Sequence, residues 1–153
     1  FYREYYAPNL VISDHRRNIA DLSEGETYQG NYSDPDIFRK KGYSTLSNKH
    51  VDLFTYDERR AFLFEVKSTE NRNFRVQARK GIVQLYEYDY FEIGKFKKEK
   101  NIEFEEQYNV LVPSREPTDK KYIEFINYLD LGVATVGGKK LNPVGKDFGF
   151  SRI

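Results

Sequence analysis

The sequence predicts an α/β domain with a mixed central β-sheet of about five strands flanked by helices. Short runs rich in aromatic and β-branched residues alternate with longer stretches in which apolar residues recur at helical spacing. Near the C-terminus a strand, a helix and a second strand follow one another, an order that favours a right-handed parallel crossover. The 153 residues are long enough to bury one core, so we expect a single domain over residues 1–153.

The first residues carry the weakest structural signal. We expect residues 1–33 to form a poorly defined N-terminal arm, in which residues 1–12 suit a strand or a packing arm. Residues 14–22 fit a short helix with an aspartate as its cap. Glu24 and Glu26 lie in a glycine-containing stretch and are interpreted as solvated loop side chains.

A helix and a strand are expected next. Asp34 and Pro35 are typical of a helix cap and first turn, and Gly42 would end that helix. Residues 43–47 then predict an edge strand. This strand would lead directly into the stretch around which the chain is organised.

That central stretch, residues 50–68, predicts a β-hairpin. Its two arms, residues 51–56 and 61–68, are rich in aromatic and β-branched residues, and a charged cluster at 57–60 separates them. Side chains alternate between the two faces of a strand. The second arm therefore has one face made of Ala61, Leu63, Glu65 and Lys67 and an opposite face made of Phe62, Phe64 and Val66.

The register of the hairpin places two carboxylates opposite each other. With the turn centred between residues 58 and 59, the opposed pairs are Tyr56 with Ala61, Phe54 with Leu63, and Asp52 with Glu65. Directly opposed side chains have Cβ atoms about 4.5–5.5 Å apart, and like charges at that distance repel. A divalent cation held by both carboxylates would remove this cost. The structural alternative is an ion pair of Glu65 with Lys67, with Asp52 exposed at the hairpin end.

These residues resemble the metal-binding signature of the PD-(D/E)XK nuclease superfamily, which has the restriction-endonuclease-like fold. Asp52 takes the first acidic position, and Glu65-Val66-Lys67 matches the (D/E)XK tripeptide. Asn-Lys-His-Val stands where a proline often precedes the aspartate. Downstream, Gln84-Leu-Tyr-Glu-Tyr88 resembles the QxxxY element of the RecB-like branch. The resemblance implies a core of a helix, three strands, a helix and a strand.

The resemblance further implies a Mg²⁺-dependent deoxyribonuclease, most simply an endonuclease. Asp52 and Glu65 would bind the metal, with the Val66 carbonyl as a further oxygen ligand and Mn²⁺ as a substitute cofactor. Lys67 would orient the attacking water or stabilise developing negative charge. Gln84 joins these as a catalytic residue that supports the lysine, and Tyr88 would position the nucleic acid.

His50 would share a face with Asp52 if the strand extends that far. In that position it could contact a phosphate or help to hold a metal. An isolated histidine at the start of a strand is more often a polar surface residue, and we interpret it so.

A helix is predicted from about residue 76 to residue 92. Its apolar face would consist of Ala78, Ile82, Val83, Leu85 and Tyr86. Lys80, Gln84 and Tyr88 are spaced four apart and line one stripe of the helix. Gly81 in mid-helix costs about 1 kcal/mol relative to Ala, so we expect another backbone to approach closely there.

Basic residues on and after this helix are candidate contacts to a phosphate backbone. We assign Arg79 and Lys80 on the helix, and Lys97 and Lys98 in the cluster that follows it. Acidic residues at positions 103, 105 and 106 interrupt any continuous basic stripe, and a run of this kind is usually a solvated surface.

The last third of the chain supplies the parallel crossover. Residues 108–113 predict a buried strand, and a helix capped at residue 118 or 119 follows. The inward residues of that helix would be Tyr122, Ile123, Phe125, Ile126 and Leu129. Residues 132–136 form a further strand, and residues 139–153 a short tail suited to a hairpin arm or a linker.

Composition narrows the classes of function. The chain has no Cys, which excludes disulfides, thiolate nucleophiles, thiolate zinc sites and the iron–sulfur branch of the superfamily. No apolar run approaches 18 residues and no signal-peptide pattern is present, so we expect a cytoplasmic protein without membrane contact. The formal net charge of +1 decides nothing about nucleic acid.

The function predicted from the sequence is hydrolysis of phosphodiester bonds in DNA by a metal-dependent nuclease. The alternative is a catalytically silent module of the same fold that binds nucleic acid or protein. DNA is the expected partner, and both a homodimer and a place in a larger multidomain protein stay open.

Overall fold

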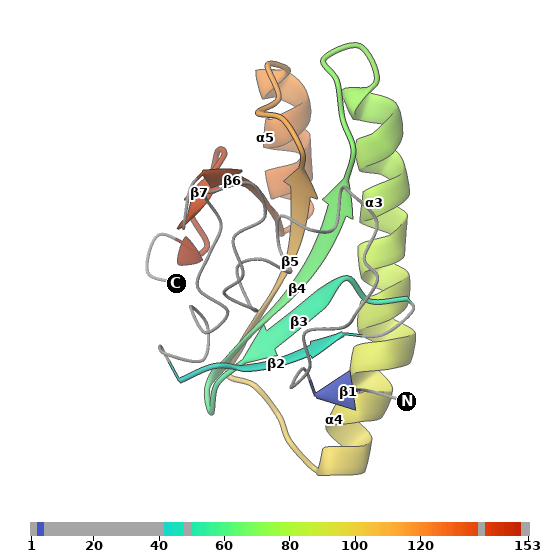
Figure 1. Cartoon of the computed structure of the whole chain (residues 1–153), viewed down its shortest axis with the longest axis vertical. Helices are drawn as coiled ribbons and strands as arrows, with labels where there is room; N and C mark the ends of the chain where they lie inside the picture. Colours follow the sequence, from blue (N-terminus) through green and yellow to red (C-terminus); the bar gives the residue numbers. More distant parts are fainter. Residues whose placement is uncertain (1–2, 5–41, 48–49, 138–139, 151–153) are drawn as a thin grey trace.

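The strands of the sheet lie side by side in the order in which they occur along the chain (Figure 1). A computed structural model describes residues 3–4, 42–47, 50–137 and 140–150. Its strands are β1 (Arg3–Glu4), β2 (Ser44–Ser47), β3 (Leu53–Tyr56), β4 (Arg60–Lys67), β5 (Glu106–Pro113), β6 (Leu131–Gly137) and β7 (Lys140–Pro143). The expected N-terminal helices, Glu24 and Glu26 lie outside the described residues.

The sheet is mixed and open, as predicted. Strands β4, β5 and β6 are parallel to one another, whereas the pairs β1–β2, β2–β3, β3–β4 and β6–β7 are antiparallel. The short outer strands β1 and β7 extend the five strands expected from the sequence. The prediction that residues 43–47 form an edge strand is wrong, because β1 pairs with the free side of β2.

The β3–β4 hairpin has the predicted register. Phe54 lies opposite Leu63 and Tyr56 opposite Ala61. The turn closes through a hydrogen bond from Asp57 N to Arg60 O of 2.9 Å, and the Asp57 carboxylate accepts from the backbone N–H groups of Arg59 and Arg60. A short polar side chain that satisfies the turn backbone is a common reason for aspartate at this position. The turn therefore fixes which residues meet at the far end of the hairpin.

The two faces of the sheet bury separate apolar clusters. One cluster joins Ala61 and Leu63 of β4 to the helices, including Ala78, Leu85 and Ile126. The other contains Phe62, Phe64 and Val66 of β4 together with Phe148 and Phe150 of the C-terminal segment. This division confirms the predicted alternation along β4, and it places Glu65 and Lys67 on the face that the helices cover (Figure 1).

A long helical run covers this face between β4 and β5. It consists of α3 (Phe74–Tyr88), a π-helical turn (Asp89–Ile93) and α4 (Gly94–Lys100), so it extends beyond the predicted end at residue 92. The Asp89 carboxylate accepts hydrogen bonds from the side chains of Gln107 and Asn109 on β5. This contact anchors the π turn to the sheet, and Ile93 and Phe96 remain buried beyond it.

Two residues assigned to the apolar face of α3 are exposed instead. Val83 is 56% exposed and Tyr86 46%, whereas Ala78, Ile82 and Leu85 are buried as predicted. Val83 lies two positions from both Gly81 and Leu85, about 200° around the helix from each, and Tyr86 lies beyond the edge of the buried stripe, so helix geometry itself turns both outward. The Tyr86 hydroxyl donates to the Leu129 carbonyl at 2.9 Å, which joins α3 to the residue that caps the C-terminal end of the helix over residues 120–128.

The crossover between β5 and β6 contains α5 (Lys120–Tyr128), whose predicted cap is confirmed. Asp119 accepts a hydrogen bond from Tyr122 N at 3.1 Å. Tyr122, Ile123 and Ile126 are buried, but the inward assignment of Phe125 is wrong because its side chain is 44% exposed in a groove beside α3. Among the described residues, no helix has the length and apolar character needed to cross a bilayer.

Candidate metal and nucleic-acid site

Asp52 sits just before β3 and reaches across to the neighbouring strand. Its Oδ2 atom accepts a hydrogen bond from the backbone N–H of Val66 at 2.8 Å. The observed β3–β4 pairs end at Leu53 opposite Phe64, so Asp52 and Glu65 are the next residues along the two arms, and their pairing stays a prediction. The side chain is half-buried, and its Oδ1 atom is shielded from solvent. Asp52 is therefore not the exposed hairpin-end residue that the structural alternative assumes.

Glu65 and Lys67 form an ion pair on the face of β4 that packs against α3. Lys67 Nζ donates to Glu65 Oε1, and both side chains are largely buried, with the Glu65 side chain only 2% exposed. Two positions apart on a strand, they project from the same face. Taking two such charges out of water is costly, so a buried pair of this kind is weak evidence for a purely stabilising role.

The Val66 carbonyl is directed to the β3 side of β4, the side on which Asp52 lies. In an extended strand the N–H and C=O groups of one residue face the same neighbour. The N–H of Val66 meets Asp52 on the β3 side, whereas the carbonyl of Lys67 accepts from Ser114 N on the β5 side at 2.8 Å. The carbonyl of Val66 is thus directed past the start of β3, beside Asp52.

This donor set fits a hard divalent cation. Asp52 Oδ1 and Glu65 Oε2 are buried oxygen atoms, and the carbonyl of Val66 adds a third oxygen. Mg²⁺ is commonly held by one or two carboxylates and completes its shell with waters and substrate phosphate. The part of the chain that the structure describes contains no group of three or more His, Cys, Asp or Glu side chains suited to a metal.

The stem of Lys67 lies between α3 and β5. A Cβ atom built on Gly81 would come within 3.3 Å of Lys67 Cγ and 3.4 Å of Lys67 Cε, and it would overlap Leu111 Cδ1. The expected close approach at Gly81 is present, but two side chains make it rather than a backbone. Leu111 is the β5 residue in register with Glu65, so the contact occurs directly beside the ion pair.

Gln84 and Tyr88 continue along the helix from Gly81. The Gln84 amide donates to the Tyr88 hydroxyl at 2.9 Å, and both side chains are half-buried. His50, two residues before Asp52, has its ring centroid 6.5 Å from that of Tyr88. The structure thus groups Asp52, Glu65 and Lys67 with the helix stripe that carries Gln84 and Tyr88. It also brings His50, which we interpreted as a surface residue, to the edge of this group.

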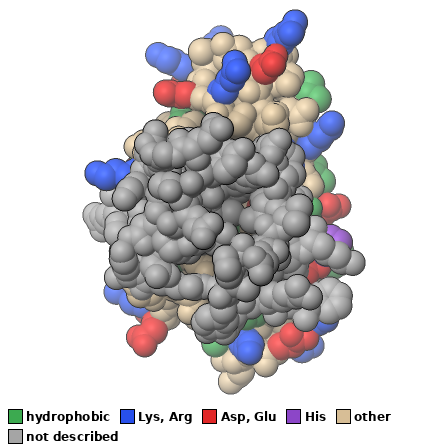
Figure 2. Space-filling view, viewed as in Figure 1, with side chains coloured by type: hydrophobic (Ala, Val, Ile, Leu, Met, Phe, Trp, Pro, Cys, Tyr) green, Lys and Arg blue, Asp and Glu red, His purple; other side chains and the backbone are tan. Residues whose placement is uncertain are grey.

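The basic residues assigned to nucleic acid do not lie together. Lys80 shares the stripe of Gln84 and Tyr88, whereas Arg79 lines the groove between α3 and α5. Lys97 on α4 pairs with Glu103 at 3.0 Å, and its neighbour Lys98 is exposed. Figure 2 shows basic and acidic side chains interspersed at both ends of the described part of the visible face. The predicted set of basic contacts is therefore divided among separate surfaces.

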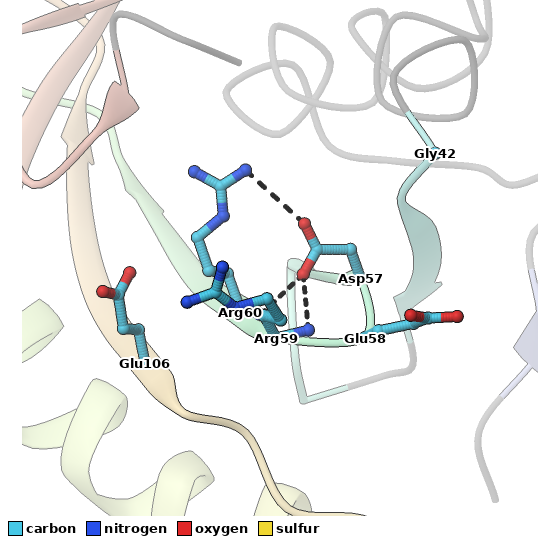
Figure 3. Close-up of a pocket in the computed structure, with 6 residues that line it drawn as sticks. All are labelled: Gly42, Asp57, Glu58, Arg59, Arg60 and Glu106. Atoms are coloured by element: carbon cyan, nitrogen blue, oxygen red, sulfur yellow. Dashed lines mark hydrogen bonds and ion pairs between the residues drawn. The ribbon is translucent and has the colours of Figure 1, made fainter.

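A second polar cluster lies at the opposite end of the hairpin (Figure 3). Its hollow is lined by Gly42, the turn residues Asp57, Glu58, Arg59 and Arg60, and Glu106. Arg60 reaches Asp57 at 3.5 Å and the Tyr43 hydroxyl at 2.5 Å. Burial acts to raise the pKa of Asp57, but hydrogen bonds from the Arg60 and Arg59 backbone and the Arg60 guanidinium outweigh it, so the pKa is lowered. These contacts stabilise the turn and satisfy its charges internally.

Sequence reasoning did not assign Ser114, which the structure places beside the backbone of Lys67, or the position of His50 beside Tyr88. Ser114 donates its backbone N–H to the Lys67 carbonyl, and its Oγ accepts from Thr69 N at 2.9 Å. The only sequence signal for Ser114 is its position directly after a strand parallel to β4, where the carboxyl ends of neighbouring strands meet. His50 carried a signal through its shared face with Asp52, but nothing in the sequence related it to Tyr88.

Comparison of the chain with protein-family models, with curated proteins and with solved structures finds no match. The assignment of the site therefore depends on the residues and their geometry.

Proposed function

We propose that this chain is a metal-dependent nuclease that hydrolyses phosphodiester bonds in DNA, acting as an endonuclease. The observation that carries the proposal is that the Asp52 carboxylate is bonded to the Val66 backbone, directly between Glu65 and Lys67, which form a buried ion pair. Two acidic side chains and a lysine in a mostly buried position need a chemical reason, and phosphate chemistry supplies one.

The metal in this proposal is Mg²⁺, with Mn²⁺ as a substitute. Asp52, Glu65 and the Val66 carbonyl would hold it, since all three offer the oxygen ligands that these ions prefer. When bound, the ion would lower the pKa of an attacking water and neutralise charge on the scissile phosphate. The backbone N–H of Val66 keeps the Asp52 carboxylate oriented toward β4, so the hairpin itself arranges the ligands.

Lys67 would act on the reacting atoms as a fixed positive charge. Its ammonium is already held beside Glu65 on β4. From there it would donate a hydrogen bond to the attacking water or to a phosphate oxygen as negative charge develops. We assign it this role rather than that of a base, because a carboxylate partner holds its ammonium as a donor.

Gln84 and Tyr88 would support the reaction from the helix. The bond between the Gln84 amide and the Tyr88 hydroxyl fixes both side chains relative to each other. Their stripe continues from Gly81, whose position lies against the stem of Lys67. We therefore assign Gln84 to positioning around the lysine, and Tyr88 with Lys80 to contact with the bound strand.

The order of elements also supports the proposal. Three strands, β2, β3 and β4, precede α3, and β5 follows it, as the resemblance to the PD-(D/E)XK superfamily implies. Asp52 lies just before β3, Glu65 and Lys67 lie on β4, and Gln84 and Tyr88 lie on α3 within that order. Fold alone does not fix function, so this agreement adds to the chemistry of the site and does not replace it.

The direct test is incubation with supercoiled double-stranded DNA and with circular single-stranded DNA. Each substrate is tested with Mg²⁺, Mn²⁺, Ca²⁺ or EDTA, and Glu65→Gln serves as the matched inactive control. We expect nicking or linearisation of circles in Mg²⁺ and Mn²⁺, and none in EDTA or with the variant. Equal cleavage by the variant would assign the activity to a contaminant, and no cleavage with any metal would contradict the proposal.

The second candidate is a catalytically silent binding module. Two observations favour it: Glu65 is already neutralised by Lys67, and several aromatic side chains on the helices are exposed, including Tyr90, Phe91 and Tyr128. Exposed aromatic residues are enriched at interaction surfaces. This candidate predicts DNA or protein binding that is unaffected by Mg²⁺ and by Glu65→Gln. Neither candidate function depends on whether the chain acts as a homodimer or as one domain of a larger protein.

A further inference from the structure

We infer that Gly81 is a positioning residue for Lys67, and that the missing side chain at position 81 sets where the lysine ammonium lies. The inference rests on the proposed function, because Lys67 has a reacting group to serve only if the chain is a nuclease. Gly81 is fully helical, buried and in the middle of α3, so no turn or cap explains a glycine there.

The contacts around position 81 are specific. A Cβ atom there would overlap Leu111 Cδ1, and it would crowd Lys67 at both Cγ and Cε, at 3.3 and 3.4 Å. The added Cβ would therefore contact the Lys67 side chain at two points along its stem, and not only at its flexible end. The Lys67 stem runs past Gly81 from Cγ to Cε, and its ammonium then reaches Glu65.

The surroundings leave the stem little room to move elsewhere. The backbone of Lys67 is held by Ser114 N, and Leu111 lies in register with Glu65 on the adjacent strand. A methyl group at position 81 would displace the stem by a few tenths of an ångström. A shift of about 1 Å in a group that must face a reacting atom can cost about 100-fold in rate, so a shift of a few tenths of an ångström corresponds to a loss of about three- to tenfold.

The chain contains a matched control in the same helical run. Gly94 is exposed, and a Cβ atom there would meet only the Asp89 carbonyl at 3.6 Å, an ordinary contact. Alanine is a better helix former than glycine at both positions. Gly94→Ala should therefore keep or raise the melting temperature and leave cleavage unchanged. Gly81→Ala is the same chemical change, but it should lower both the melting temperature and the rate of cleavage.

The test measures kcat and KM for DNA cleavage, and the melting temperature, in wild type, Gly81→Ala, Gly94→Ala, Leu111→Ala and Gly81→Ala with Leu111→Ala. We expect Gly81→Ala to lower kcat by about three- to tenfold with KM for DNA nearly unchanged. The double variant removes the closest overlap, so it should regain melting temperature while kcat stays low. It also serves as the folded sample if Gly81→Ala alone is unstable. Full kcat in Gly81→Ala or in the double variant would overturn the inference.

A melting cycle gives a readout that does not depend on activity. Lys67→Ala removes the Cγ and Cε atoms that position 81 crowds, so Gly81→Ala should lower the melting temperature less in that background than in wild type. Equal effects in both backgrounds would show that Gly81 and Lys67 do not share a space, and would overturn the inference. If the wild type cleaves no DNA, the proposed function is rejected. The melting cycle would still show whether Gly81 and the Lys67 stem share a space.

Discussion

Asp52 Oδ2 accepts a hydrogen bond from the backbone N–H of Val66 at 2.8 Å. Asp52, a candidate metal ligand, therefore also joins the open end of the hairpin whose other strand carries Glu65. The carboxylate stands where a backbone carbonyl of β3 would otherwise pair with β4. Asp52 therefore has a structural role through one oxygen, and its buried second oxygen is placed for a metal. Substitutions that keep or remove the acceptor separate these two roles.

The first prediction compares Asp52→Asn with Asp52→Ala in EDTA at neutral pH and low salt. Opposed carboxylates about 5 Å apart repel by about 3 kcal/mol at an effective dielectric of 20, and Lys67 offsets part of this. Asn keeps an oxygen acceptor for Val66 N–H and removes the charge, so this variant should melt at the wild-type temperature or higher. Ala leaves the N–H without its acceptor and should lose about 1–3 kcal/mol, measured by thermal denaturation.

Addition of Mg²⁺ to the same samples distinguishes the metal site from the ion-pair alternative. Ligand that binds only the folded state raises the melting temperature. Wild type should respond to Mg²⁺, and both Asp52 variants should respond little. A clearly destabilised Asp52→Asn variant, combined with an equal response to Mg²⁺ in all three proteins, would reject the metal site.

The second prediction concerns Lys67. Lys67→Met keeps an apolar stem beside Gly81 but removes the ammonium that donates to Glu65. We expect kcat for DNA cleavage to fall by about 100-fold to 1,000-fold, the usual cost of one donor to developing charge. Mg²⁺ binding, measured by calorimetry, should be largely kept because oxygen atoms alone would ligate the metal. Retained turnover, or loss of Mg²⁺ binding, would show that Lys67 has a different role.

The third prediction uses two adjacent basic residues on different sides of α3. Lys80 lies on the Gln84 stripe, and Arg79 lies in the groove beside α5. Each change to Gln removes one positive charge, so net charge cannot explain a difference between them. Lys80→Gln should weaken duplex binding and lower the salt slope by about 0.9, whereas Arg79→Gln should leave the slope unchanged. The measurement is a binding titration at several salt concentrations, in Ca²⁺ to prevent turnover.

The same titration applies to the cluster on α4. Lys97→Ala with Lys98→Ala should weaken binding equally across DNA sequences, and the salt slope should fall by about 0.9 for each phosphate that the protein no longer neutralises. Because Lys97 is paired with Glu103, we expect a reduction that corresponds to one phosphate rather than two. An unchanged slope would identify this cluster as solvated surface.

The fourth prediction is a pH dependence of stability that arises from the turn and not from the candidate site. The pKa of Asp57 is lowered in the folded state by hydrogen bonds from the Arg60 and Arg59 backbone, against the effect of burial. A group whose folded pKa is depressed stabilises the fold above its unfolded pKa of about 3.9, and this contribution is lost as pH falls through the folded pKa. Asp57→Asn should therefore be less stable than wild type at pH 7, and the difference should shrink below about pH 4. Denaturant titrations across pH measure it, and a constant difference would contradict the assignment.

The sequence by itself determined the hairpin and the residues that meet on it. Alternation along β4 fixed which side chains share a face, and the position of the charged turn fixed the register, so the pairs Phe54–Leu63 and Tyr56–Ala61 followed from local rules. The cap of α5 at Asp119 was predictable for the same reason, since a single side chain bonds its own helix. Such features depend on neighbours in the chain or directly across one hairpin.

Only the tertiary structure decided how closely α3 approaches the sheet. The close contact at Gly81 with Leu111 and the Lys67 stem could not be read from the sequence, whereas the exposure of Val83 and Tyr86 follows from their angular distance from the buried stripe of α3. The same approach places the Lys67 stem, and the meeting of parallel strand ends places Ser114 beside it. These contacts join residues from distant parts of the chain, and their distances depend on the volumes of all the side chains packed between the elements, which periodicity does not encode.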